Sequence, residues 1–188
     1  PSNAVEIEEF NANTEDILYG IEKDFIHATG DETFRLTDKV ENGRLKADQG
    51  IICGCAGGTY SNIMAATHII KKAGADLTNF NFSVYPSSQP VYLDLMKKQA
   101  LYDLAECGVT IKQCFCGPCF GIGDTPANHG FSIRHVTRNF VTREGSRPEQ
   151  GQSAAVALMD ARSIAATAVN GGRLTPATDF ADDYEIPA

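Results

Sequence analysis

The sequence predicts an α/β fold, a three-layer α/β/α domain built on a mainly parallel sheet. Its length of 188 residues, with 43% hydrophobic and 21% charged residues, suits one globular domain with a substantial core. From Ile51 onward, short apolar segments alternate with longer amphipathic ones, which is the pattern of successive βα units. Glycines stand where the helical patterns stop, at Gly74, Gly108 and Gly171-Gly172, as is typical of helix C-termini.

The expected elements follow in chain order. Residues before about Gly50 are polar and weakly patterned, with one helix expected over 14–25 and a connection over 31–43. The remaining expected elements are a strand at 51–53, a helix at 60–72, a strand with period-2 character at 80–85, a helix from 90 to 107, strands at 110–113 and 131–136, and a helix beginning near residue 153. Pro90 suits the first turn of its helix, where no backbone N–H is needed.

Periodicity also predicts which helix faces are buried. In the helix after Pro90, residues at helical spacing are expected to form the inner face: Leu93, Met96, Ala100, Leu104 and Cys107. In the last helix, small residues are expected to share one face and let the helix approach the sheet closely: Ala154, Ala157, Ala161, Ala165 and Ala168.

Loops that directly follow expected strands are the natural place for a functional site. They are Gly54–Gly58, Pro86–Gln89, Cys114–Gly123 and Thr137–Arg143. In a parallel sheet these loops meet at one edge, and open α/β sheets bind their ligands beyond the carboxyl ends of the strands. The sequence therefore predicts a single site there.

Two of these loops carry most of the six cysteines of the chain, in the segments Cys53-Gly54-Cys55 and Cys116-Gly117-Pro118-Cys119. Thiolates are the usual ligands of iron–sulfur clusters and of zinc, and a C-x-x-C pair can place two sulfurs on one centre. A third thiolate from the other loop would complete a three-cysteine site. Spacing alone does not choose between iron–sulfur, zinc and redox chemistry, although a reduced metal site fits this pattern better than a disulfide framework.

The residues around the cysteines resemble those of the aconitase and isopropylmalate-isomerase superfamily. The first motif is the apolar strand and turn from Ile51 to Tyr60, with Cys55 at the ligand position. The second is C-G-P-C with the following apolar residue and glycine, Cys116 to Gly121. The third is R-N-F-x-x-R, Arg138 to Arg143, and the closing phrase is Leu174 to Phe180. The motifs keep the family's order and approximate spacing over residues 50–180.

This resemblance implies an aconitase cluster-domain-like fold with a [4Fe-4S] cluster held by Cys55, Cys116 and Cys119. Three protein ligands leave one iron open to substrate. The resemblance also assigns Arg138 and Arg143 to the binding of a small di- or tricarboxylate, because a guanidinium offers a planar fork of donors that matches a carboxylate.

The implied protein is a hydro-lyase, an aconitase-like hydratase of which this chain is the third, cluster-bearing domain. The family's catalytic serine, acid and histidines lie in other domains, so no catalytic residue is expected here and the chain alone should be inert. Residues 1–4 are expected to be an expression-tag remnant, 5–49 a lead-in segment packed on the domain, and 50–188 the iron–sulfur domain of a longer protein. Its partners would be the carboxylate substrate and the remaining domains.

Several departures from the family pattern leave alternatives open. Cys53 and Cys114 each stand two residues before an expected ligand, where they are either packing or oxidation-prone thiols or a source of a fourth thiolate. A fully thiolate-ligated cluster, or zinc, would make the chain a non-catalytic interaction domain. Thr137 replaces an asparagine of the family and Ala56-Gly57 replace Thr-Asn, so the substrate stays open. Cys107 is expected in the core, and no chemistry is assigned to the histidines (His68, His129 and His135).

Charge and hydropathy exclude other classes. The net charge of −8 disfavours nucleic-acid binding, which normally needs a basic surface. No stretch approaches the roughly 20 apolar residues of a membrane span. With no signal peptide recognised, a cytoplasmic location is expected.

Overall fold

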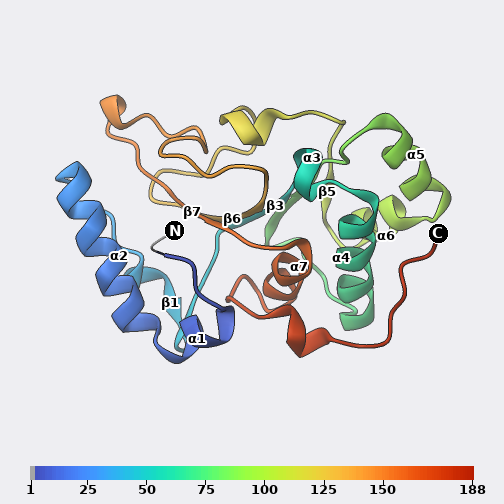
Figure 1. The fold of residues 1–188 in the computed structure, drawn as a ribbon, viewed down its shortest axis with the longest axis horizontal. Coiled ribbons are helices and arrows are strands. Elements are labelled where there is room, and N and C mark those ends of the chain that lie inside the picture. Colours follow the sequence, from blue (N-terminus) through green and yellow to red (C-terminus); the bar gives the residue numbers. More distant parts are fainter. Residues whose placement is uncertain (1–2) are drawn as a thin grey trace.

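The computed structural model describes residues 3–188, so part of the expected tag remnant, residues 1–2, lies outside the described residues. The centre of the molecule is a five-stranded sheet in the order β5-β4-β3-β6-β7, and every neighbouring pair is parallel (Figure 1). The strands are β3 (Gln49–Ile52), β4 (Asn81–Val84), β5 (Thr110–Ile111), β6 (Phe131–His135) and β7 (Ala155–Leu158). The expected α/β class, consistent with a three-layer α/β/α domain, is confirmed.

The strand order creates a switch point between β3 and β6. The first strand of the sheet, β3, lies in its middle, and β4 and β5 are added on one side of it. The chain then crosses to the other side of β3, where β6 and β7 are added. Ile52 at the end of β3 pairs with His135 at the end of β6. The loops that leave these two strands run in opposite directions, and such a point is where open α/β sheets bind ligands.

Four helices pack together as one layer against the sheet. They are α4 (Tyr60–Ala73), α5 (Gln89–Lys97), α6 (Ala100–Glu106) and α7 (Ala161–Val169). Helix α4 lies between α7 and α6, and α7 also contacts β3 and β6. The apolar residues of this layer form the main core, in which Ile63, Ile70 and Ile164 are fully buried. As predicted, α4 ends at Gly74, whose φ of 60° is in the left-handed region that favours glycine.

The prediction of a single helix between Pro90 and Cys107 is wrong, because the chain forms two helices there, α5 and α6. Gln99 adopts a φ of 61°, which no helix interior allows. The break changes the buried face, since Leu93 and Met96 are 47% and 54% exposed while Leu95 is fully buried. Periodicity carried across a break assigns the wrong face. In α6 the expected burial of Ala100 and Leu104 is correct, and Cys107 is half-buried.

The last helix starts later than predicted, because its expected first turns form β7. Residues 155–158 pair with β6 from Phe131↔Ala155 to Arg134↔Leu158. An alanine-rich segment favours a helix locally, but pairing with the exposed edge of β6 overrides that preference. Asp160 then caps α7, whose small face is buried as predicted at Ala161, Ala165 and Ala168. Ala154 and Ala157 do not belong to that face.

The N-terminal segment adds α1 (Ile7–Ala12), α2 (Thr14–Thr29), the 3-10 helix η1 (Thr37–Lys39) and the antiparallel hairpin β1 (Val40–Glu41) and β2 (Arg44–Leu45). Of these, the sequence predicted α2 alone. The segment contacts the end of the chain, because the amide of Asn11 donates to the Leu174 carbonyl at 3.0 Å. The last 3-10 helices are η3 (Pro148–Gln150) and η4 (Ala177–Phe180), and the tail after η4 returns along α4, where Asp182 binds His68 and Lys72.

None of the helices formed by residues 3–188 is both long enough and apolar enough to cross a membrane.

Candidate functional site

The predicted ligand cysteines lie beyond the carboxyl ends of the strands. Cys55 lies on the short helix α3 (Gly54–Gly57), directly after β3. Cys116 and Cys119 flank the 3-10 helix η2 (Gly117–Phe120), in the loop between β5 and β6. Cys119 is buried, whereas Cys55 and Cys116 are exposed. The two loops lie together, because Cys53 Sγ is 3.9 Å from Cys119 Sγ and a Cβ at Gly54 would be 3.1 Å from the same sulfur. Burial, followed by the nearby thiols of Cys119 and Cys55, raises the pKa of the Cys116 thiol.

Other groups around these thiols bear on what they can hold. Within residues 3–188, no three His, Cys, Asp or Glu side chains are placed as a metal-ligand set as they stand. The donor set is nevertheless chemically suited to an iron–sulfur cluster. A Cβ at Gly54 would lie 3.1 Å from Cys119 Sγ, so a side chain at that position would press against this sulfur. The Nδ1 atom of His135 is buried at the same edge without a hydrogen-bond partner among the described residues.

The Cys55 loop is pressed against the switch point. A Cβ on Gly57 would lie only 2.0 Å from the His135 carbonyl oxygen, and one on Gly58 would lie 2.2 Å from that of Tyr85. The backbone N–H of Cys53 donates to the His135 carbonyl at 3.1 Å. Glycine is therefore required for the close approach of this loop to the ends of β6 and β4.

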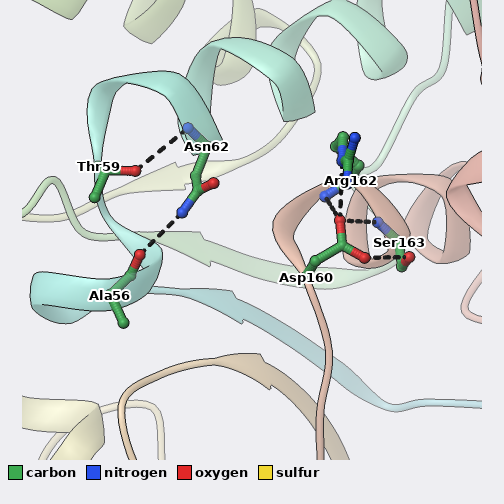
Figure 2. Close-up of polar contacts among 6 residues, drawn as sticks. All are labelled: Ala56, Thr59, Asn62, Asp160, Arg162 and Ser163. Atoms are coloured by element: carbon green, nitrogen blue, oxygen red, sulfur yellow. Dashed lines mark hydrogen bonds and ion pairs between the residues drawn. The ribbon is translucent and has the colours of Figure 1, made fainter. Parts of the chain in front are cut away.

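Polar side chains at two helix N-termini finish this edge (Figure 2). At α4, Thr59 Oγ1 accepts from the backbone N–H of Asn62, whose side-chain amide donates to the Ala56 carbonyl at 2.9 Å. Asn62 thus holds the residue next to Cys55. The sequence analysis did not single out Asn62, although the third helical position after an N-cap is a recognisable place for a polar side chain.

At α7, Asp160 accepts from the backbone N–H groups of Arg162 and Ser163 and from the Ser163 hydroxyl. Burial raises the pKa of Asp160, but these hydrogen bonds together outweigh it and hold the pKa below its usual value. The negative charge also suits a helix N-terminus.

A buried arginine, Arg134 on β6, lies under the C-G-P-C turn and was not predicted. It is 2% exposed and donates to the carbonyl oxygens of Pro118 and Asp124 at 3.2 and 2.9 Å. Arginine is almost never fully buried without a partner, so a charged residue inside the apolar segment 131–136 was the available signal.

The two arginines expected to bind substrate differ in their surroundings. Arg138 is exposed. Arg143 is half-buried: its Nε donates to the Cys119 carbonyl, and its guanidinium lies 4.5 Å from the centroid of the Phe120 ring. The R-N-F-x-x-R loop therefore touches the C-G-P-C turn, with Arg143 as the contact.

The residues that depart from the family pattern are also placed. Thr137 Oγ1 lies 3.3 Å from Cys55 Sγ, and Cys53 Sγ lies 3.9 Å from Cys119 Sγ. Cys53 is fully buried, and burial raises its pKa. Cys114 is half-buried. His129 stacks on Phe34 at a centroid distance of 5.2 Å.

A cavity lies beside this edge rather than on the cysteines. Its volume is about 670 Å³, between α2 and the loop after β6. Its walls include Phe25 and Phe34 on one side and Phe140 and Val141 on the other. The cavity reaches the R-N-F-x-x-R loop through residues 139–142 but is not lined by the thiols.

Comparison with known proteins agrees with the motifs. The model of the Aconitase family (aconitate hydratase) matches residues 1–171. The chain is 30% identical over 141 residues to 3-isopropylmalate dehydratase large subunit 1 of Thermotoga maritima, covering 74% of this chain and 32% of the relative. It is 32% identical over 129 residues to the 3-isopropylmalate dehydratase large subunit of Mycolicibacterium smegmatis, covering 68% and 30%. The chain thus spans about a third of the length of these relatives. The chain belongs to the aconitase family.

Proposed function

We propose that this chain is the cluster-bearing, carboxylate-binding part of a [4Fe-4S] hydro-lyase that acts on small di- or tricarboxylic hydroxy acids. The observation that carries the proposal is the meeting of the Cys53–Cys55 segment with the Cys116–Cys119 turn at the switch point of a parallel sheet, where Cys53 Sγ lies 3.9 Å from Cys119 Sγ. The hydro-lyase class is that of the family and of the dehydratase relatives, which are longer proteins.

Cys55, Cys116 and Cys119 would hold the cluster. When bound, the cluster would supply a Lewis acid for the hydroxyl and carboxylate of the substrate. The protein side of the chemistry is positioning. Asn62 holds the Cys55 loop through the Ala56 carbonyl, and Arg143 touches the C-G-P-C turn. Arg138 has a free approach from solvent for a substrate carboxylate.

Analysis of iron, acid-labile sulfide and zinc tests this proposal. After anaerobic reconstitution of the chain, we expect about four irons and four sulfides per chain. Zinc bound without sulfide would overturn the proposal and favour the interaction domain. A cluster with a fourth thiolate from Cys53, which lies beside Cys119, would also favour that alternative. In that case Cys53→Ser would lose iron, whereas a three-cysteine site should keep it.

The reconstituted chain should also be inert by itself. Incubation with citrate, isocitrate and 3-isopropylmalate should give no turnover above the background without enzyme, because no acid–base group is expected in this chain. Turnover above that background would show that the chain carries its own catalytic residues.

Arg138 and Arg143 should respond differently to alanine. Arg138→Ala should leave stability within about 0.5 kcal/mol, because the side chain is exposed. Arg143→Ala should cost about 1–2 kcal/mol, because it loses a hydrogen bond and a cation–π contact. Urea unfolding of both variants measures this difference, and equal stabilities would contradict it.

In a protein that includes the remaining domains, either replacement should weaken turnover strongly. A lost charge-assisted fork to a carboxylate is worth about 1.5–3 kcal/mol. Arg138→Lys should keep only part of the turnover, because an ammonium cannot present two parallel donors. Unchanged kcat/KM in Arg138→Ala would remove that residue from the substrate site.

A further inference from the structure

We propose that Arg134 is a positioning residue for the cluster ligands, fixing the Cys116–Cys119 turn from beneath and placing a positive charge there. The charge part rests on the proposed function, whereas the positioning part concerns the turn itself. Nothing in the motifs that identify the family includes this residue.

The first step is that the sheet fixes the guanidinium. Arg134 Nε donates to Ser132 Oγ at 2.8 Å, and its Nη2 donates to Gln49 Oε1 at 3.3 Å. The Ser132 hydroxyl in turn donates to Gln49 Oε1 at 2.8 Å. Ser132 is fully buried and Gln49 is 3% exposed. Ser132 and Arg134 share one face of β6, so this small polar network holds the guanidinium in one orientation.

The second step is that the other donors of Arg134 bind the loop between β5 and β6, which carries Cys116 and Cys119, at two points. Nη1 donates to the carbonyl of Pro118, the residue between Gly117 and Cys119. Nη2 donates to the carbonyl of Asp124, whose side chain accepts from the Tyr85 hydroxyl at 2.7 Å. A 3-10 helix as short as η2 has little stability of its own. Its shape therefore depends on these external contacts.

The third step is charge. Among the described residues, no carboxylate lies within 4.0 Å of the guanidinium of Arg134. The carboxylates of Glu144 and Asp124 lie farther away, where they still attract the charge of Arg134, but they accept hydrogen bonds from Ser146 and Tyr85 instead. A buried cation without an acidic partner is costly, and carbonyl oxygens compensate only in part. An anionic thiolate-ligated centre on the turn would add a counter-charge on the side of the cysteines.

Arg44 provides a matched control at the opposite end of the sheet. Its guanidinium also donates to a backbone carbonyl and a hydroxyl, those of Leu174 and Thr175, at 3.4 and 3.2 Å. It lies on β2, ahead of the first residue of β3. Arg44→Met thus removes two hydrogen bonds, one to a carbonyl and one to a hydroxyl, without touching the loop that carries Cys116 and Cys119.

The first experiment uses the cluster-free 188-residue chain, with iodoacetamide alkylation of each cysteine followed by mass spectrometry. In Arg134→Met, the buried Cys119 should be alkylated at least tenfold faster than in the unaltered chain, while Cys107 on the far helix layer keeps its rate. Arg134→Lys should show a similar loosening, because a single ammonium cannot grip both carbonyls. Arg44→Met should leave Cys119 unchanged. Unchanged Cys119 rates in both Arg134 variants, or equal acceleration at Cys107, would overturn the proposal.

The second experiment reconstitutes the same chains and measures iron affinity and the midpoint potential of the cluster. Loss of outer-shell support typically weakens metal binding 10–100-fold, which we expect for Arg134→Met. The potential should fall in Arg134→Met and stay near its original value in Arg134→Lys, which keeps the charge. Equal potentials in the two variants would overturn the charge role. If the unaltered chain takes up no iron, the proposed function fails, and the alkylation rates still decide whether Arg134 positions the turn.

Discussion

Replacing Cys116 by serine should abolish the uptake of iron and sulfide by the chain while leaving its fold intact. The side chain is exposed, so its loss removes a thiolate without opening a cavity. Cys55→Ser should behave in the same way for the same reason. Iron and sulfide content after reconstitution, together with urea unfolding, separates the loss of a ligand from the loss of the fold.

Cys107→Ser is the control for these replacements. Cys107 ends α6, where burial raises the pKa of its thiol, and it lies outside the loops that carry the expected ligands. This variant should take up as much iron as the unaltered chain. Full iron uptake by Cys116→Ser would remove Cys116 from the ligand set, and equal losses in Cys107→Ser would show that the cysteines act only through folding.

Gly57→Ala should be among the most destabilising single replacements in the chain. The new methyl group would lie 2.0 Å from the His135 carbonyl oxygen, which belongs to β6 and cannot move without breaking the pairing with β3. Overpacking against a fixed backbone costs 1–3 kcal/mol and sometimes more, and we expect about 3 kcal/mol here. Urea unfolding measures this cost.

Gly20→Ala is the matched control for the glycine replacement. Gly20 lies in α2, and a Cβ there would meet no atom within 4 Å. Since alanine favours a helix over glycine, this variant should gain about 0.5–1 kcal/mol. A Gly57→Ala chain as stable as the unaltered one would mean that the Cys55 loop is not pressed against β6 in solution.

The βα rhythm of the sequence was sufficient to predict the parallel sheet, because apolar strands and amphipathic helices differ in period. It failed where tertiary contacts override local preference. The alanine-rich stretch before Asp160 pairs with β6 although it favours a helix, and the chain turns at Gln99 although no glycine or proline marks that position. Neither event has a local signal.

The site shows the same division. The sequence places Cys55, Cys116 and Cys119 on loops after strands, and the parallel sheet brings those loops to one edge. Their role as ligands stays a prediction. The supporting residues were missed because their roles depend on three-dimensional contacts: Arg134 reaches carbonyls 10 and 16 residues earlier, and Asn62 reaches back to Ala56. A pattern of residue types does not encode such contacts.

The pairing of β3 with β6 also sets the order in which the site can assemble during folding. Gln49 on β3 meets Ser132 on β6 across 83 residues, whereas β4 can join β3 once α4 has formed between them. Closing the longer loop costs more entropy, so β6 should dock late. The cysteine loops therefore meet only near the end of folding, and metal uptake should follow folding rather than nucleate it. Pulse-labelled hydrogen exchange should show the Cys53 amide, which donates to the His135 carbonyl, becoming protected after the amides of α4.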